Sequence, residues 1–417
     1  MLKRFAIFFL VLGLLSCKSR LTDNRIEISD YKYDIIDLDT VTQEMEKSDS
    51  LKVGVLLPLS GNFKAIGSGM QNAMFMALDD LQNDKLVLTF YDTRSLAAGA
   101  KEAINKAVDE GVKIILGPLT SEEVEAVAPI AMSENIPVVS FTTSPQVLQK
   151  GIYSIGLLNG EQIERTLDYA NKQGKKNIAL LVPDNNSGLN VVKSTIMSIQ
   201  NKDMVLSKVG FYNPSSLDFT SLINDMSAER EFDVVLVADG GNRLKSIVSM
   251  FAYNDIMYPD VLFVGTSAWD NTNLSKETIL YHGVYPMVSK SYGEYFTNKY
   301  KEVFGEQPRN IYPIAYDGVL LASVLSGKTN QPLEESLTSK KGFIGVNGYF
   351  KILPTGQSRH SLEIYEVTAN GPKVVSKGDK NIDYSENEID IRYVPYSSLP
   401  KIYGKNTSDV LTWLYNN

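Results

Sequence analysis

From Leu51 onwards, short runs of β-branched residues alternate with longer amphipathic stretches, and this alternation limits the chain to few folds. The pattern is typical of βαβ units, in which helices separate the strands of a parallel sheet. The strand-like runs fall into two sets, which predicts two α/β domains, with a break near residues 153–159, rather than one long sheet. The first set is 52–57, 86–91, 112–116 and 137–140, and the second is 177–182, 205–211, 233–238 and 261–265.

Helical periodicity fills the intervals between these runs, as in residues 69–81, where apolar residues recur at helical spacing. Beyond the second set we expect a further strand at 283–288 and helices at 292–304 and 312–325. The last part of the chain has the pattern of short antiparallel strands joined by tight turns. These strands are predicted at 345–353, 361–367 and 373–375.

The N-terminus has the features of an export signal. Lys3 and Arg4 precede an apolar run over residues 5–15. That run is shorter than the roughly 20 residues that a membrane-spanning helix needs. Residues 1–16 are therefore predicted to be a signal peptide.

The only cysteine of the chain stands at the end of this signal. Residues 14–17 (Leu-Leu-Ser-Cys) resemble the bacterial lipobox, which implies a lipid on Cys17 that anchors the protein to a membrane. The alternative is a plain secretory signal with an incidental cysteine. Lys18 stands where inner-membrane lipoproteins typically have aspartate, which favours the outer membrane, and the polar residues 17–50 are expected to form a flexible tether.

Composition excludes several classes of protein. One cysteine cannot form a disulfide within the chain, and with two histidines it cannot complete a Cys/His zinc site. The chain has 41 basic and 49 acidic side chains, whereas nucleic-acid binding needs a basic surface. No motif predicts a metal or another cofactor.

Candidate ligand contacts come from the rule that open parallel sheets bind ligands beyond the carboxyl ends of their strands. Hydroxyl groups and helix N-termini at these ends suit a carboxylate or another small anion. The predicted cleft residues are Ser60, Gly61, Thr120, Ser121, Thr142, Thr143, Asn186, Ser187, Asp239 and Ser267.

Several of these residues also have a purely structural interpretation. Thr120 and Glu123 have the spacing of a capping box, so Thr120 and Ser121 are either helix caps or ligand contacts. Asp239 is followed by two glycines and fits a turn better than a binding element. Trp269 is expected to anchor the core or a loop.

Catalytic motifs are weak. The sequence around Ser68 does not fit the G-x-S-x-G nucleophile elbow, and the stretch at 327–329 lacks the first glycine of a phosphate-binding loop. His282 and His360 lie far apart and are predicted to be surface or structural residues. We therefore expect no enzymatic activity, and a hydrolase is the least supported class.

The motifs at 53–61 (VGVLLPLSG), 116–121 (LGPLTS), 315–317 (AYD) and 345–348 (GVNG) resemble the type I periplasmic binding proteins of the leucine-binding group. The resemblance covers about 51–371. It implies a fold of two α/β lobes, each a doubly wound parallel sheet, with a short antiparallel hairpin near the C-terminus. Three crossings join the lobes, which close over a ligand. The implied boundaries are 51–156 plus 285–341 for lobe I, 157–284 plus 342–380 for lobe II, and a C-terminal extension at 381–417 that packs on the body.

Amino-acid receptors of this group hold their ligand from positions that match Thr120 or Ser121, Thr142 and Thr143. The chain departs from their pattern elsewhere, because Ile66 and Ser187 replace aromatic residues and Ser267 replaces the acid that binds the ammonium group. A buried ammonium without a counter-charge is costly, so these departures argue against amino-acid binding.

Other stretches are similar to the penicillin-binding-protein activators of the same fold, namely 115–119, 123–129, 160–162, 181–185 and 265–270. This resemblance implies a lipoprotein that binds a cell-wall synthase and regulates peptidoglycan synthesis. The alternative is a lipoprotein that delivers a branched-chain amino acid or a similar small polar ligand to the permease of an ABC importer. Both hypotheses place the protein in the periplasm.

Overall fold

The computed structural model describes residues 50–200, 202–271, 273–328, 331–378, 382 and 400–416. The predicted signal peptide, Cys17 and nearly all of the tether lie outside the described residues. Within the described part, no helix is both long enough and apolar enough to cross a membrane.

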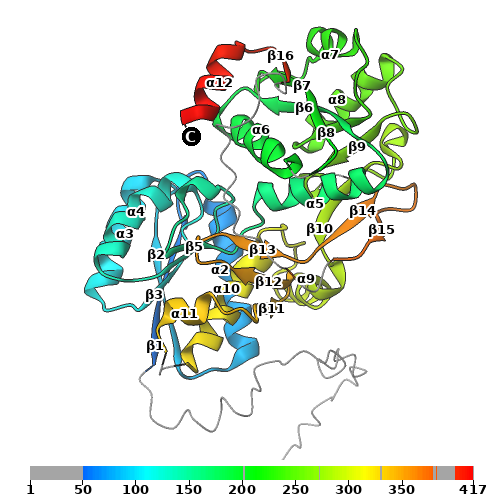
Figure 1. The fold of residues 1–417 in the computed structure, drawn as a ribbon. Coiled ribbons are helices and arrows are strands. Elements are labelled where there is room, and N and C mark those ends of the chain that lie inside the picture. Colours follow the sequence, from blue (N-terminus) through cyan, green and yellow to red (C-terminus); the bar gives the residue numbers. More distant parts are fainter. Residues whose placement is uncertain are drawn as a thin grey trace, which may run out of the picture. The chain divides into compact units, whose positions relative to one another are not determined.

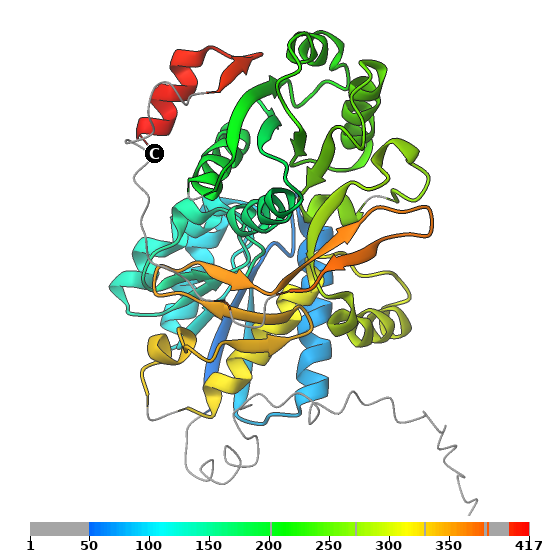
Figure 2. The ribbon, with the colours of Figure 1, turned by 45° about the vertical axis from the view of Figure 1, so that its right-hand side comes forward.

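The first sheet is parallel throughout and has the strand order β2-β1-β3-β4-β5 (Figure 1). Its strands are β1 (Leu51–Leu57), β2 (Leu86–Asp92), β3 (Ile114–Leu116), β4 (Val138–Ser140) and β5 (Ile152–Ser154). One face packs against α3 (Ala97–Asp109) and α4 (Ser121–Ser133). The other face packs against α2 (Lys64–Leu81) and a helix from much later in the chain, α10 (Tyr312–Ser326). Figure 2 shows α2 and α10 side by side.

The second sheet has the order β15-β14-β10-β9-β8-β6-β7-β16. Its strands are β6 (Asn177–Pro183), β7 (Val205–Tyr212), β8 (Val234–Val237), β9 (Leu262–Gly265), β10 (Val284–Val288), β14 (Leu362–Glu366), β15 (Lys373–Ser376) and β16 (Lys401–Tyr403). One face is covered by α5 (Asn159–Lys172) and α6 (Asn186–Ile199), and the other by α7 (Thr220–Ser227) and α8 (Gly241–Tyr253). Strands β14 and β15 are antiparallel to their neighbours, whereas β16 adds to the edge in parallel with β7.

A third, antiparallel sheet consists of β11 (Phe343–Gly345), β12 (Gly348–Ile352) and β13 (Ser358–His360). The remaining elements are α9 (Lys290–Phe304), α11 (Leu333–Leu337), α12 (Thr407–Asn416) and the 3-10 turns η2 (Pro145–Val147), η3 (Ser267–Asn271) and η4 (Thr278–Leu280). Side chains of α9, α11, β11 and β12 belong to the same core as α2 and α10.

Two of the expected lobe boundaries place strands with the wrong sheet. The implied boundaries place residues 285–288 in lobe I, but β10 pairs with β9 and β14 in the second sheet. They also place residues 343–352 in lobe II, but Phe343, Phe350 and Ile352 lie in the core of the first sheet. Both boundaries are implied by the family resemblance, and the sequence pattern does not correct them because it identifies a buried strand without identifying its neighbour.

The predicted alternation of strands and helices is confirmed, and most predicted elements match within a few residues. Helix α2 begins earlier than expected, at Lys64. The run 345–353 is not one strand, because Gly345 and Gly348 flank the turn between β11 and β12. The short strands β5, β13 and β16 were not predicted.

Candidate functional site

The predicted contacts of the first sheet follow β1, β3 and β4, which are neighbours in strand order. The contacts of the second sheet follow β6, β8 and β9, which are also neighbours. Parallel strands end at the same edge, so each sheet brings its own set to one edge. The residues differ in whether their polar side-chain groups are exposed to solvent or hydrogen-bonded within the protein.

Thr120 acts as the N-cap of α4. Its hydroxyl accepts a hydrogen bond from the Glu123 backbone N–H at 3.3 Å, and the Glu123 carboxylate accepts one from the Thr120 N–H at 3.0 Å. The capping interpretation is therefore confirmed for Thr120. Ser121 is the first residue of the helix, and its hydroxyl lies 3.4 Å from the Glu122 carboxylate.

Ser60 and Gly61 form a turn that Asp92 organises from the end of β2. The Asp92 carboxylate accepts hydrogen bonds from the backbone N–H groups of Leu59 at 2.9 Å and Ser60 at 3.0 Å. Partial burial raises the pKa of Asp92, but hydrogen bonds from Ser60 and backbone groups outweigh it, so the pKa is lowered. Gly61 has φ +77°, and a Cβ there would lie 2.4 Å from the Arg94 carbonyl oxygen, so its role in the turn requires glycine.

Thr142 and Thr143 follow β4 and differ in exposure. Thr142 is 3% exposed, and its hydroxyl accepts a hydrogen bond from the Ser144 N–H at 3.2 Å. Thr143 is exposed, so its hydroxyl is the more accessible of the two.

In the second sheet, Asn186 and Ser187 are exposed at the start of α6. Asn185 caps this helix by accepting a hydrogen bond from the Gly188 N–H at 3.0 Å. Asp184, at the end of β6, forms an ion pair with Lys405 from the segment between β16 and α12. The exposed polar groups of Asn186 and Ser187 are thus flanked by a neutralised carboxylate.

Asp239 follows β8 and contacts Tyr212, Arg243 and Gly240. Its Oδ2 accepts hydrogen bonds from the Tyr212 hydroxyl at 2.7 Å and Arg243 Nη1 at 2.6 Å, and its Oδ1 accepts one from the Gly240 N–H at 2.8 Å. Burial and the hydrogen bond to Asp239 raise the pKa of Tyr212, and the hydrogen bond to Asp239 raises the pKa of Arg243. The Asp239 carboxylate is therefore paired within the protein.

Ser267 begins η3 after β9, and its backbone N–H donates to the Gln162 side chain at 2.7 Å. Trp269, in the same turn, is fully buried and donates from Nε1 to the Val237 carbonyl oxygen at 3.0 Å. The expectation that Trp269 anchors the core is confirmed.

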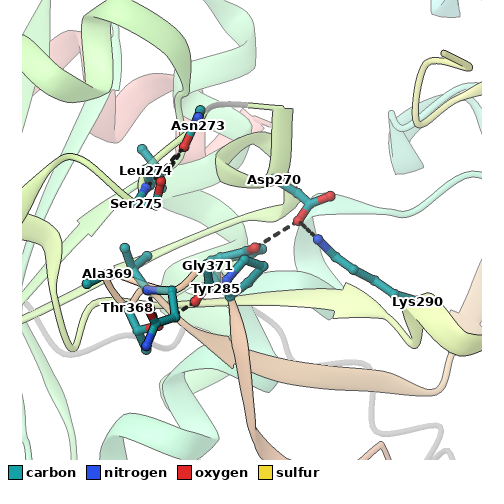
Figure 3. A pocket seen from close by; sticks show the side chains of 12 residues that line it. Asp270, Asn273, Leu274, Ser275, Tyr285, Lys290, Thr368, Ala369 and Gly371 are labelled. Carbon is teal, nitrogen blue, oxygen red and sulfur yellow. Dashed lines mark hydrogen bonds and ion pairs between the residues drawn. The ribbon is translucent and has the colours of Figure 1, made fainter.

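A pocket of about 510 Å³ beside the second sheet, lined also by Lys290 at the start of α9, was not predicted (Figure 3). Asp270, Tyr285 and Lys290 provide its hydrogen-bonded groups, and its rim comes from residues 273–275 and the 367–372 turn between β14 and β15. The sequence marked 367–372 only as a turn, and Tyr285 only as part of a strand. Asp270 lay in a recognised motif, but nothing in the sequence connected it with residues about 100 positions later.

The two sheets, each with polar residues beyond the carboxyl ends of its parallel strands, are typical of a two-lobed α/β binding-protein fold. A sequence profile described as periplasmic binding protein matches residues 50–372, so the chain belongs to the periplasmic binding protein family. The two-lobed fold expected from the sequence is confirmed by solved structures. An ABC transporter substrate-binding protein from Sphaerobacter thermophilus has a TM-score of 0.66 at 18% identity, covering 79% of this chain and 99% of that one.

The curated relatives include two kinds of binding protein, beside uncharacterised proteins of Rickettsia prowazekii and Methanocaldococcus jannaschii. A Leu/Ile/Val-binding protein of Rhizobium johnstonii is 25% identical over 44% of this chain and 53% of its own length. The penicillin-binding protein activator LpoA of Histophilus somni is 23% identical over 55% of this chain and 38% of its own length. The chain thus spans about half or less of the length of these two relatives, and both resemblances noted in the sequence have counterparts among them.

Proposed function

We propose that the protein is a non-catalytic, lipid-anchored binding protein of the cell envelope that regulates a partner, with a peptidoglycan synthase as the favoured partner. The observation that carries this proposal is the absence of an open acid among the predicted cleft residues in the described part of the chain. Asp239 is paired with Arg243 and Tyr212, and by the resemblance to the amino-acid receptors Ser267 stands where their ammonium-binding acid would be. The relationship to the activator LpoA supports the same role.

The partner hypothesis is tested by binding between the purified chain without residues 1–17 and the periplasmic domains of cell-wall synthases from the same organism. We expect saturable binding to one synthase and a change in its polymerase or transpeptidase rate. No binding to any synthase, together with unchanged cell-wall synthesis after gene deletion, would contradict the proposal.

The second candidate is a substrate-binding lipoprotein of an ABC importer, and the Leu/Ile/Val-binding relative favours it. The two candidates differ in a thermal-denaturation screen against amino acids and small anions. A ligand at 100 times its Kd should stabilise the folded protein by about 2.7 kcal/mol. Stabilisation of this size by an amino acid would favour the importer, and we expect none.

The anchor is proposed to be a lipid on Cys17, with the outer membrane as its location. Cys17→Ser should abolish acyl-chain labelling and release the protein from the membrane fraction. Lys18→Asp is the matched variant, because it should keep the lipid and move the protein to the inner membrane on a density gradient. Full membrane retention of Cys17→Ser would overturn the anchor.

A further inference from the structure

The pocket beside Asp270 has a rigid floor. Tyr285 is 3% exposed and lies between two other aromatic rings, with centroid distances of 6.2 Å to Trp269 and 5.9 Å to Tyr365. Its hydroxyl donates to Asp270 Oδ1 at 2.8 Å, as Figure 3 shows. The Asp270 carboxylate is therefore held in one orientation by a side chain that cannot easily move.

One acid and one base line the pocket, and they are paired. Lys290 Nζ lies 2.6 Å from the same Asp270 oxygen, and the side chains are 45% and 12% exposed, respectively. The formal charge of the lining is thus zero. A ligand with a net charge gains little here, because binding either charge would require separating the pair.

The rim is fixed before any ligand arrives. Asn273 Oδ1 accepts a hydrogen bond from the Ser275 hydroxyl at 2.8 Å, and the Thr368 hydroxyl donates to the Gly371 carbonyl oxygen at 2.6 Å. Turns closed by their own hydrogen bonds lose little conformational entropy on binding, so the pocket is preorganised.

We infer that this pocket binds a small, neutral, polyhydroxylated molecule of about the size of a mono- or disaccharide. A hydroxyl group can donate to a carboxylate and accept from an ammonium group, so neighbouring hydroxyls satisfy Asp270 and Lys290 without separating them. The volume of about 510 Å³ lies within the range of roughly 300–1,000 Å³ of small-molecule sites. A zwitterionic amino acid fits less well, because its two charges need partners that are free of each other.

Isothermal titration of the full chain with glucose, N-acetylglucosamine and maltose, beside leucine, tests this inference. We expect saturable binding of at least one of the sugars and none of leucine at this pocket. Asp270→Asn and Lys290→Met should each weaken sugar binding by roughly tenfold, which is the effect of losing one hydrogen bond to a charged group.

Glu277→Gln is the matched control, because Glu277 forms a similar ion pair with Lys245 at 2.7 Å and does not line the pocket. It should leave sugar binding unchanged. Lys290→Met keeps the test valid if Asp270→Asn does not fold, since Lys290 is nearly half exposed. Absence of binding for all three sugars at millimolar concentration, or binding that both pocket variants leave unchanged, would overturn the inference. Because none of these residues belongs to the predicted cleft, failure here would leave the proposed partner role standing.

Discussion

Gly265 illustrates how strongly a single position depends on its neighbours. A Cβ at this residue would lie 2.1 Å from the indole ring of Trp269, which is fully buried and hydrogen-bonded. The ring cannot move aside without breaking its bond to Val237. The glycine therefore makes room for the side chain that fixes the turn after β9.

Gly265→Ala should consequently destabilise the fold by about 1–3 kcal/mol through overpacking. Urea denaturation followed by tryptophan fluorescence measures the change. Gly160→Ala is the control, because its Cβ would meet only Ser194 Oγ at 3.7 Å, within helix α5, where alanine is the better residue. Equal stability of the two variants would contradict the expected clash.

Asp317 predicts a pH dependence of stability. Burial raises the pKa of this carboxyl to about 7, although the backbone N–H groups of Asn347 and Val346 donate to it and His360 lies near. The folded chain thus binds the proton more tightly than the unfolded chain does. The free energy of unfolding should therefore fall as the pH rises from about 4 to about 7.

Asp317→Asn removes this titration and should flatten the stability profile over that range. Chemical denaturation at pH 5 and pH 8 provides the comparison. A wild-type chain that is more stable at pH 8 than at pH 5, with the same difference in the variant, would contradict the assignment to Asp317.

At the scale of elements, a carboxylate at the N-terminus of α5 connects the segment before this helix with the end of β13. Glu161 Oε1 accepts a hydrogen bond from the Leu158 N–H at 3.1 Å, and Oε2 accepts one from the His360 N–H at 2.8 Å. The His360 side chain also contacts this carboxylate, with Nδ1 2.8 Å from Glu161 Oε1. Residue 158 precedes α5 and residue 360 ends β13. One buried carboxylate therefore connects two segments about 200 residues apart in sequence.

Glu161→Gln places an amide nitrogen where these donors point, so it should loosen both segments. Hydrogen exchange should become faster at 155–158 and 358–361 while the core of the first sheet stays protected. Glu164→Gln, which removes only the more exposed pair with Arg359 at 2.7 Å, should have little effect. Equal exchange in both variants would argue against a special role for Glu161.

The C-terminal extension is a second element with a measurable contribution. Strand β16 covers the edge of β7, and Val410 and Leu414 of α12 are 1% and 7% exposed in the core that includes α6. Leu414→Ala should cost about 2–5 kcal/mol of stability, whereas Thr412→Ala, on the exposed face, should change it by less than about 0.5 kcal/mol. Thermal denaturation distinguishes the two. A neutral Leu414→Ala would mean that α12 is not needed for stability.

For the whole molecule, the sequence predicted more of the fold than of the site. Strands and helices were predictable because periodicity reports which faces are buried. The neighbours of β10 were not, because pairing depends on residues distant in sequence. Likewise, the neutralisation of Asp239 by Arg243 had a local signal in their four-residue spacing, but the contribution of Tyr212 had none. The pocket also joins segments from η3 to the β14–β15 turn, which no local pattern connects.

The first sheet is completed by α9, α10 and β11–β12, which come after the whole succession from α5 to β10. A fragment of residues 50–156 lacks those partners and should stay without fixed tertiary packing. We expect weak near-ultraviolet circular dichroism and poorly dispersed amide resonances. Addition of residues 289–353 in trans should restore dispersion, and a fragment that folds alone would contradict this dependence.

Three connections join the two halves of the protein, namely β5 to α5, β10 to α9 and β13 to β14. This path of the chain also has a consequence for proteolysis. A protease that cuts one of these three connections leaves the other two covalently intact. A nicked molecule should therefore migrate as one species in a native gel and separate into two fragments only in detergent. Such a protein can lose a peptide bond between its halves and still keep them at a high effective concentration. A single cut should therefore leave the two halves associated and the protein functional.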